Sequence, residues 1–407
     1  MVRQHVRQGI RLAPRLILAA VGMAAASVAD GGTPAAIAMH VSTIAYANEI
    51  EGSLMRAFNG LRESNLKQAL TEIDKALESK PNFLLGHLLK GDMLMARAGR
   101  PVAFASLDAS AASVAPLQDE ARVRVRRYLD APRIDYLPAA VLQLSNSQQH
   151  VLVVDTTRQR LFVYANELGR PRYIADFYIS LGKSGTDKER EGDQKTPIGV
   201  YRITSVKEKL PDFYGSRAFP IDYPNEWDRM NGRQGHGIWL HGTPSTTYSR
   251  PPRATDGCVV LTNDDFARLS RYVDVSRTPV VIGQSVQWHE ARAWEGERDQ
   301  FLSSFNKWKS DWESLDVDRY FSHYSPQSRT DFAAWKSAKR KINSGKSWVK
   351  VGVNDMSLFA YPGGRDMMMV TFEQDYRSSN LSNRTVKRQY WVREGREWRI
   401  LHEAVIS

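Results

Sequence analysis

The stretch TDGCVVLTN, residues 255–263, contains the only cysteine of this 407-residue chain. A glycine-containing turn leads into an apolar, β-branched run, so the pattern predicts Cys258 at the start of a strand, with its sulfur at a sheet edge. A single cysteine excludes an intrachain disulfide framework and a multi-thiolate metal site. Cys258 is therefore either a buried small hydrophobe, as the following Val-Val-Leu would allow, or a reactive thiol.

A histidine that could activate this thiol lies 17 positions earlier, at His241 in the short β-rich run GIWLHGTP (residues 237–244). A free thiol has a pKa of about 8.5, and a neighbouring imidazolium lowers that pKa so that the thiolate forms at working pH. The imidazole needs an acceptor on its other nitrogen, for which the candidates are the carboxylates of Asp256 and Asp193 or a backbone carbonyl. The pattern thus favours a Cys–His site for attack on an acyl group.

The tetrahedral intermediate of such a reaction requires N–H donors. The backbone N–H groups of Gly257 and Cys258 are placed by the sequence to supply them, and a glycine before the nucleophile leaves room for a substrate carbonyl. His236, five residues before His241, is the substitute base if His241 faces away. If His241 faces the thiol, we interpret His236 as a loop histidine.

Three ordered motifs resemble the YkuD-type L,D-transpeptidase domain. They are GDQKTPIG (192–199), HGTP (241–244) and TDGC followed by Asn263 (255–263). The resemblance implies a mostly-β catalytic sandwich, which we expect over residues 149–285. It also implies that Cys258 attacks the amide after the third residue of a peptidoglycan stem peptide, that D-alanine leaves, and that the acyl group passes to an amine.

Carried over position by position, the resemblance makes His241 the general base, Gly242 the residue whose carbonyl orients that histidine, and Gly257 the glycine beside the oxyanion hole. The sequence departs from the commonest family pattern twice. Asp256 stands where many members have histidine, and Val260 stands where many have arginine. A valine cannot pair with a substrate carboxylate, so that task would fall to other residues.

Candidate substrate-binding residues surround these motifs. Arg250 and Arg253 precede the cysteine turn, and a guanidinium offers the bidentate geometry that a carboxylate requires. Tyr223 and Trp239 could line a groove for a sugar–peptide polymer, although core packing is the alternative for both. His236 completes the set.

Residues 48–130 show helical spacing and a repeat of about 34 residues that resembles the tetratricopeptide pattern. Small residues recur in register, Ala57 with Gly91, and prolines recur at Pro81 and Pro116, where the pattern ends a helix. Only two units are legible, so a plain helical bundle is the alternative. Either would serve as a docking surface for an envelope protein or as a structural cap.

The remaining chain divides into a β-rich and an α+β part. Short β-rich runs separated by Gly/Pro/Asp-rich loops are expected at 151–155, 160–164, 173–181, 199–204, 237–241, 258–261 and 279–282. Residues 290–407 begin with helices expected at 290–312 and 330–342. Three long alternating strands follow at 349–361, 367–376 and 385–405, the last interrupted by a turn at 394–396. This order resembles the NTF2-like fold.

Residues 1–29 read as a secretory leader, because four arginines precede an apolar stretch too short for the roughly 20 residues of a spanning helix. An uncleaved anchor is the alternative. No later stretch is apolar enough to span a bilayer, so we expect an exported protein of the periplasm or cell envelope without an integral membrane segment after leader removal.

The composition limits the remaining classes. Hydrophobic residues at 42% and charged residues at 25% fit folded domains and exclude a wholly disordered chain. The formal charge of +11 favours anionic partners, yet no long Lys/Arg block or nucleic-acid motif is present, so we expect no nucleic-acid role. No His/Asp/Glu set has zinc-type spacing, and we expect neither a metal nor another cofactor.

The sequence therefore predicts a peptidoglycan L,D-transpeptidase of cell-wall biogenesis and cell shape, acting on stem peptides. Two alternatives stay open. The same acyl-enzyme could pass to water, which gives an L,D-carboxypeptidase or an amidase. The chain could also be a non-catalytic cell-wall scaffold, although a scaffold requires neither Cys258 nor His241.

Overall fold

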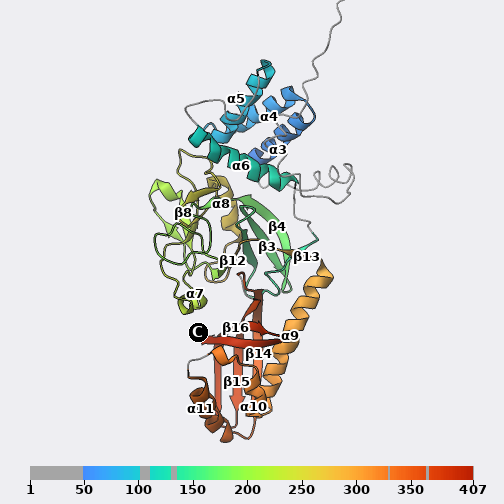
Figure 1. Ribbon diagram of the computed structural model, residues 1–407, viewed down its shortest axis with the longest axis vertical. Coiled ribbons are helices and arrows are strands. Elements are labelled where there is room, and N and C mark those ends of the chain that lie inside the picture. Colours follow the sequence, from blue (N-terminus) through green and yellow to red (C-terminus); the bar gives the residue numbers. More distant parts are fainter. Residues whose placement is uncertain (1–48, 101–110, 130–134, 329–330, 364–365, 407) are drawn as a thin grey trace, which may run out of the picture. The chain divides into compact units, whose positions relative to one another are not determined.

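The computed structural model describes residues 49–100, 111–129, 135–328, 331–363 and 366–406 (Figure 1). These residues form two compact units: the N-terminal helices together with Pro244–Pro252, and the remaining residues from 135 onward. The predicted leader, residues 1–29, lies outside the described residues. Within the described ranges, none of the helices combines the length and the apolar character that crossing a bilayer requires.

Among its described residues, the first unit contains the helices α3 (Glu49–Arg62), α4 (Leu66–Ser79), α5 (Leu84–Arg97) and α6 (Ala111–Leu129). The side chain of Asn65 caps α4 by accepting from the backbone N–H of Gln68, and the apolar faces of α3, α4 and α5 bury a common core. The helical region is confirmed. The tetratricopeptide assignment stays a prediction.

One detail of the repeat prediction is wrong. Pro116 lies inside α6 instead of ending a helix. A proline removes one backbone hydrogen bond, but the helix continues because Leu117 and Ala121, on the following turn, pack against the core of the unit.

A five-stranded sheet forms the centre of the β-rich domain, in the order β4-β3-β2-β12-β6. Its strands are β2 (His150–Asp155), β3 (Arg160–Glu167), β4 (Arg170–Tyr178), β6 (Gly199–Arg202) and β12 (Pro279–Gly283). β2 and β12 run parallel, and the other pairs are antiparallel. The two strands of this parallel pair are nearly continuous apolar runs because both faces of the sheet are covered.

The second layer positions the candidate site. It is a four-stranded sheet in the order β11-β9-β8-β7, with strands β7 (Lys207–Glu208), β8 (Arg217–Pro220), β9 (Trp239–His241) and β11 (Val259–Val260). The short strands β5 (Leu181–Gly182) and β10 (Arg253–Thr255) pair in parallel beside it. Helices α7 (Glu226–Met230) and α8 (Asn263–Leu269) and the 3-10 turn η1 (Asp212–Tyr214) complete the layer, and the predicted β-sandwich is confirmed.

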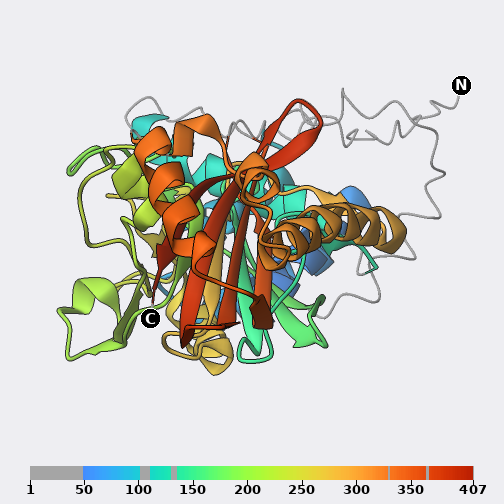
Figure 2. The ribbon, with the colours of Figure 1, turned by 90° about the horizontal axis from the view of Figure 1, so that it is seen from below.

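The C-terminal domain contains α9 (Ala291–Glu313), α10 (Val317–Ser322) and α11 (Phe332–Ser344), followed by an antiparallel sheet of β14 (Val349–Ala360), β15 (Met367–Ser378), β16 (Leu381–Glu394) and β17 (Glu397–Val405). Figures 1 and 2 show α9 running beside this sheet. Five aromatic side chains of α9 and the sheet pack edge to face in one core: Phe301, Phe305, Trp308, Phe372 and Trp391. The predicted order of helices and strands is confirmed.

The two domains of this unit share a core. Apolar residues of β2 and β3 pack with those of β14, β15 and β16 in one buried cluster. Arg388 on β16 pairs with Glu226 on α7 at 2.7 Å, and the ring of Trp227 stacks on Tyr390. The C-terminal domain is therefore a packed part of the β-rich domain's unit.

Candidate active site

The histidine ends one strand of a parallel pair, and the cysteine lies just before the other. β9 pairs with β11 so that His241 lies opposite Val260. Cys258 directly precedes β11 (Val259–Val260), so the pairing brings the cysteine turn and the histidine to the same pair of strands. His241 is buried, whereas Cys258 is half-buried and its Sγ donates to the carbonyl oxygen of Gly237 at 3.5 Å.

The imidazole of His241 is oriented by its own neighbour. Its Nδ1 lies 2.7 Å from the carbonyl oxygen of Gly242. A carbonyl oxygen only accepts, so Nδ1 carries a proton, and in the neutral form of this imidazole the lone pair is on Nε2. Of the acceptors that the sequence left open, the structure shows the backbone carbonyl in this position.

The turn after His241 is fixed by contacts from two directions. The N–H of Gly242 donates to the carbonyl oxygen of Tyr214 at 3.2 Å. The amide of Asn263 holds Thr243 twice, because its Nδ2 donates to the carbonyl oxygen at 2.9 Å and its Oδ1 accepts from the N–H at 3.1 Å. A Cβ at Gly242 would overlap Asn263 Oδ1, so this close approach requires glycine.

The turn before Cys258 is held by two threonines. Thr255 Oγ1 donates to the carbonyl oxygen of Cys258 at 2.8 Å and accepts from the N–H of Gly257 at 3.1 Å. Thr196 Oγ1 donates to the carbonyl oxygen of Gly257 at 3.0 Å. Gly257 has φ +122°, and a Cβ there would lie 2.6 Å from the carbonyl oxygen of Lys195. The N–H of Gly257, one of the two predicted oxyanion donors, is therefore engaged within the turn.

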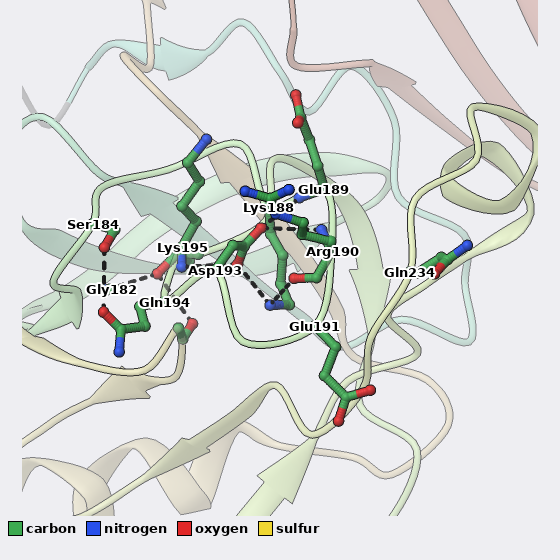
Figure 3. Close-up of polar contacts among 12 residues, drawn as sticks. Gly182, Ser184, Lys188, Glu189, Arg190, Glu191, Asp193, Gln194, Lys195 and Gln234 are labelled. Atoms are coloured by element: carbon green, nitrogen blue, oxygen red, sulfur yellow. Dashed lines mark hydrogen bonds and ion pairs between the residues drawn. The ribbon is translucent and has the colours of Figure 1, made fainter.

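Asp193 organises the loop that carries Thr196 (Figure 3). Its carboxylate accepts from Lys188 Nζ at 2.8 Å and from the backbone N–H groups of Glu189, Arg190 and Lys195. Burial alone would raise the pKa of Asp193, but these four donors outweigh it and hold the pKa well below its ordinary value. Asp193 is thus a loop anchor, and Figure 3 shows its contacts directed into its own loop.

An aromatic surface borders His241. The ring centroid of Tyr214 lies 5.1 Å from that of the His241 imidazole and 5.1 Å from that of Trp239. Phe213 is 51% exposed, and its ring centroid lies 6.4 Å from that of the imidazole. Lys207 Nζ lies 5.3 Å from the ring of Trp239. Exposed aromatic faces of this kind bind amphipathic ligands.

The predicted substrate-binding residues fall into different places. Trp239 belongs to the aromatic surface, and Arg253 is exposed on β10. Arg250 is half-buried in the Pro244–Pro252 segment of the helical unit. Tyr223 is buried and donates to the carbonyl oxygens of Lys188 and Gln234, at 3.3 and 3.0 Å, so it braces the loop. His236 is exposed, with Nδ1 3.6 Å from Glu191 Oε1.

The two departures from the family pattern also have distinct surroundings. Val260 is buried and exchanges both backbone hydrogen bonds with Ser180. Asp256 is exposed and pairs with Lys183 Nζ at 2.9 Å. Lys183 therefore adds a cation beside the cysteine turn that the sequence reasoning did not identify.

Phe213 and Asn263 were also missed as site residues. No motif singles out Phe213, because its proximity to His241 depends on the pairing of β8 with β9. Asn263 does lie within the cysteine motif. An amide at a fixed distance after the nucleophile was the signal that could have identified it as a brace for Thr243.

Comparison with known proteins identifies two domains of the chain. Residues 149–282 match the model of the L,D-transpeptidase catalytic domain, the YkuD family, and residues 300–404 match the Cds6 C-terminal NTF2-like domain. The chain thus carries a YkuD-type catalytic domain followed by an NTF2-like domain, as the sequence resemblance implies. Neither match includes helices α3 to α6.

Individual relatives point the same way. YafK of Escherichia coli K12, assigned to the L,D-transpeptidases, is 30% identical over 124 residues, which cover 30% of this chain and 45% of that protein. Bdellovibrio bacteriovorus Bd1075 is 27% identical with a TM-score of 0.59, covering 67% of this chain and 98% of that one. The helical cell shape determining protein Pgp2 of Campylobacter jejuni is 27% identical with a TM-score of 0.56, covering 67% and 96%. The match with YafK spans less than half of that relative's length.

Proposed function

We propose that this protein is a peptidoglycan L,D-transpeptidase that forms an acyl-enzyme through Cys258. The observation that supports the proposal is the His241 Nδ1 contact with the Gly242 carbonyl, combined with the parallel pairing of β9, which ends in His241, with β11, which directly follows Cys258. We infer that this arrangement sets the imidazole near the half-buried thiol. A non-catalytic wall scaffold would require none of this arrangement.

In the first half-reaction, His241 Nε2 takes the proton of Cys258 Sγ, and the thiolate attacks the carbonyl carbon of the amide after the third stem residue. The N–H of Cys258 would donate to the developing oxyanion. Collapse of the intermediate breaks the C–N bond, and the imidazolium returns its proton to the leaving amine of D-alanine. The product is a thioester on Cys258.

In the second half-reaction, His241 removes a proton from the incoming nucleophile, which attacks the thioester and releases the thiol. An amine acceptor gives a crosslink, whereas water gives L,D-carboxypeptidase or amidase activity. The buried Val260 favours hydrolysis as the second candidate, because the arginine that many members carry there is absent. The acceptor is selected by the surrounding groove, since both outcomes use the same Cys–His chemistry.

The proposed setting is the cell envelope, where the chain would be exported by its leader and would act on stem peptides in cell-wall biogenesis. The likeness to Pgp2, a cell shape determining protein, supports a role in cell shape. A further envelope partner for the helical region belongs to the same proposal.

The test is to incubate the purified protein with tetrapeptide muropeptides, with and without an amine acceptor, and to analyse the products by mass spectrometry. Crosslinked product supports transfer, and tripeptide with free D-alanine supports hydrolysis. Cys258→Ala should abolish both while the protein stays folded, and His241→Ala should slow release of D-alanine at least roughly 10²-fold. Turnover by Cys258→Ala, or no turnover by the unmodified protein, would contradict the proposal.

A further inference from the structure

Within the C-terminal domain, the end of α11 lies beside the turn between β15 and β16. The backbone N–H of Ser379 donates to the carbonyl oxygen of Trp348 at 3.3 Å, and Asn380 Nδ2 donates to that of Gly345 at 3.4 Å. These contacts hold the segment that follows α11 against the turn. We call residues 340–350 and 377–384, which these elements contribute, the α11 surface.

Three large apolar side chains of the α11 surface are exposed to solvent. Ile342 in the last turn of α11 is 55% exposed, Trp348 is 46% exposed and Leu381 is 51% exposed. The helix itself is well packed, because Phe332 and Trp335 on its other side contact the core of the domain. A single exposed apolar side chain is ordinary, but three on adjoining segments form a patch that a partner can cover.

The same surface is basic. Residues 332–353 contain no acid and six cations, which are Lys336, Lys339, Arg340, Lys341, Lys346 and Lys350. Residues 376–393, which include the facing turn, contain no acid either. A concentration of positive charge of this kind attracts anionic partners.

Some of these cations are already engaged inside the domain. Arg340 pairs with Asp318, and Lys346 Nζ donates to Asn380 Oδ1 at 2.6 Å. Lys341 and Lys350 are exposed, and neither forms an ion pair with any residue that the structure describes. The engaged cations thus fix the shape of the surface, while Lys341 and Lys350 are available to a partner.

We propose that the α11 surface is a docking site for an anionic lipid bilayer. Its lysines lie at the level of the lipid phosphates, and Ile342, Trp348 and Leu381 enter the headgroup region. Tryptophan suits this depth because its ring is apolar and its N–H is polar. A soluble polyanion would pair with the charges but would leave the three apolar side chains in water, so the bilayer fits the surface better. No catalytic step enters this inference, which is therefore independent of the proposed function.

The test is co-sedimentation of the purified full chain with vesicles of phosphatidylcholine, with or without phosphatidylglycerol. The unmodified protein should bind the anionic vesicles more tightly, and salt should weaken this binding. Lys341→Gln combined with Lys350→Gln should weaken it roughly twentyfold, because each basic side chain near an anionic membrane contributes about 1 kcal/mol, or roughly fivefold. Trp348→Ala should weaken it at least about tenfold, since the bilayer no longer buries the indole ring.

Matched variants control for charge and for apolar area. Lys67→Gln combined with Lys307→Gln removes the same charge from exposed positions on α4 and α9 and should leave binding unchanged. Leu381→Ser should weaken binding, whereas Leu168→Ser, at another exposed leucine, should not. All variants keep the same N-terminal residues, so the predicted leader contributes equally to each. Circular dichroism and the melting temperature check that each variant is folded.

A second measurement locates the contact. Brominated lipids quench tryptophan fluorescence, so the unmodified protein should be quenched on anionic vesicles. Trp348→Phe keeps an apolar ring and should still bind, but it should lose most of this quenching. No binding to anionic vesicles, equal binding by the α11-surface variants and their controls, or unchanged quenching in Trp348→Phe would overturn the inference. Binding to heparin without binding to vesicles would also overturn it, because it would indicate a site for a soluble polyanion.

Discussion

Gly242 offers a sharp test of how His241 is oriented. A methyl group at this position would overlap Asn263 Oδ1, so Gly242→Ala must rotate the asparagine side chain away. That rotation breaks both hydrogen bonds to the backbone of Thr243, at 2.9 and 3.1 Å. At about 1 kcal/mol for each, we expect Gly242→Ala to lower the free energy of unfolding by about 2 kcal/mol.

Asn263→Ala should cost a similar amount, because it removes the same two bonds. The double variant has space for the new methyl group and has no amide left to displace, so it should also cost about 2 kcal/mol instead of the sum of about 4. The expected coupling between the two sites is therefore about 2 kcal/mol in size, well above the few tenths that independent sites show.

The assay is urea unfolding of all four proteins, followed by release of D-alanine from the tetrapeptide. Each variant loosens the carbonyl that orients His241, so kcat should fall at least roughly tenfold in all three. Strictly additive stability losses would refute the reasoning, as would Gly242→Ala with an unchanged midpoint. A normal kcat in the single variants would show that the Gly242 carbonyl does not position the base.

Two further predictions concern the loop and the thiol. Asp193→Asn should lower the free energy of unfolding at neutral pH. The pKa of Asp193 is lowered in the folded state, so its carboxylate stabilises the fold fully above the unfolded pKa of about 3.9. The difference in free energy of unfolding between the two proteins should therefore shrink only as the pH falls below that value. Denaturant unfolding across acid pH measures this, and a difference that ignores pH would contradict it. A carbapenem should label Cys258 stoichiometrically, which intact-mass spectrometry detects; labelling of Cys258→Ala would show that another group reacts.

The strands that face the core on both sides could be predicted from sequence, since β2, β3 and β12 are continuous apolar runs bounded by turn residues. β8 was missed, because the run Arg217–Pro220 is short and ends in a proline, which normally argues against a strand. β8 forms a strand because it pairs with β9, and its own sequence does not indicate this pairing.

The chemical groups of the site could be identified from local motifs, whereas the contacts of the segment between those motifs could not. Cys258 and His241 each lie in a short string with a distinctive pattern. Tyr248 and Ser249 lie between those strings, but their partners Phe83 and Glu120 are more than a hundred residues away. Contacts of that sequence separation depend on how whole domains pack, and no local pattern records them.

The cation that would recognise a substrate carboxylate is the last element of the proposed site to assign. Val260 cannot serve, and the charge of Lys183 is offset by Asp256 at 2.9 Å. Arg253 is exposed on the strand that leads into the cysteine turn, and its planar guanidinium can bind a carboxylate through two parallel hydrogen bonds. Arg253→Ala should therefore raise KM roughly tenfold with little change in kcat, because a hydrogen bond to a charged group contributes about 1.5 kcal/mol or more. Arg217→Ala on β8 is the control and should leave KM unchanged. Steady-state release of D-alanine measures both, and an equal KM for the two variants would exclude Arg253 from substrate recognition.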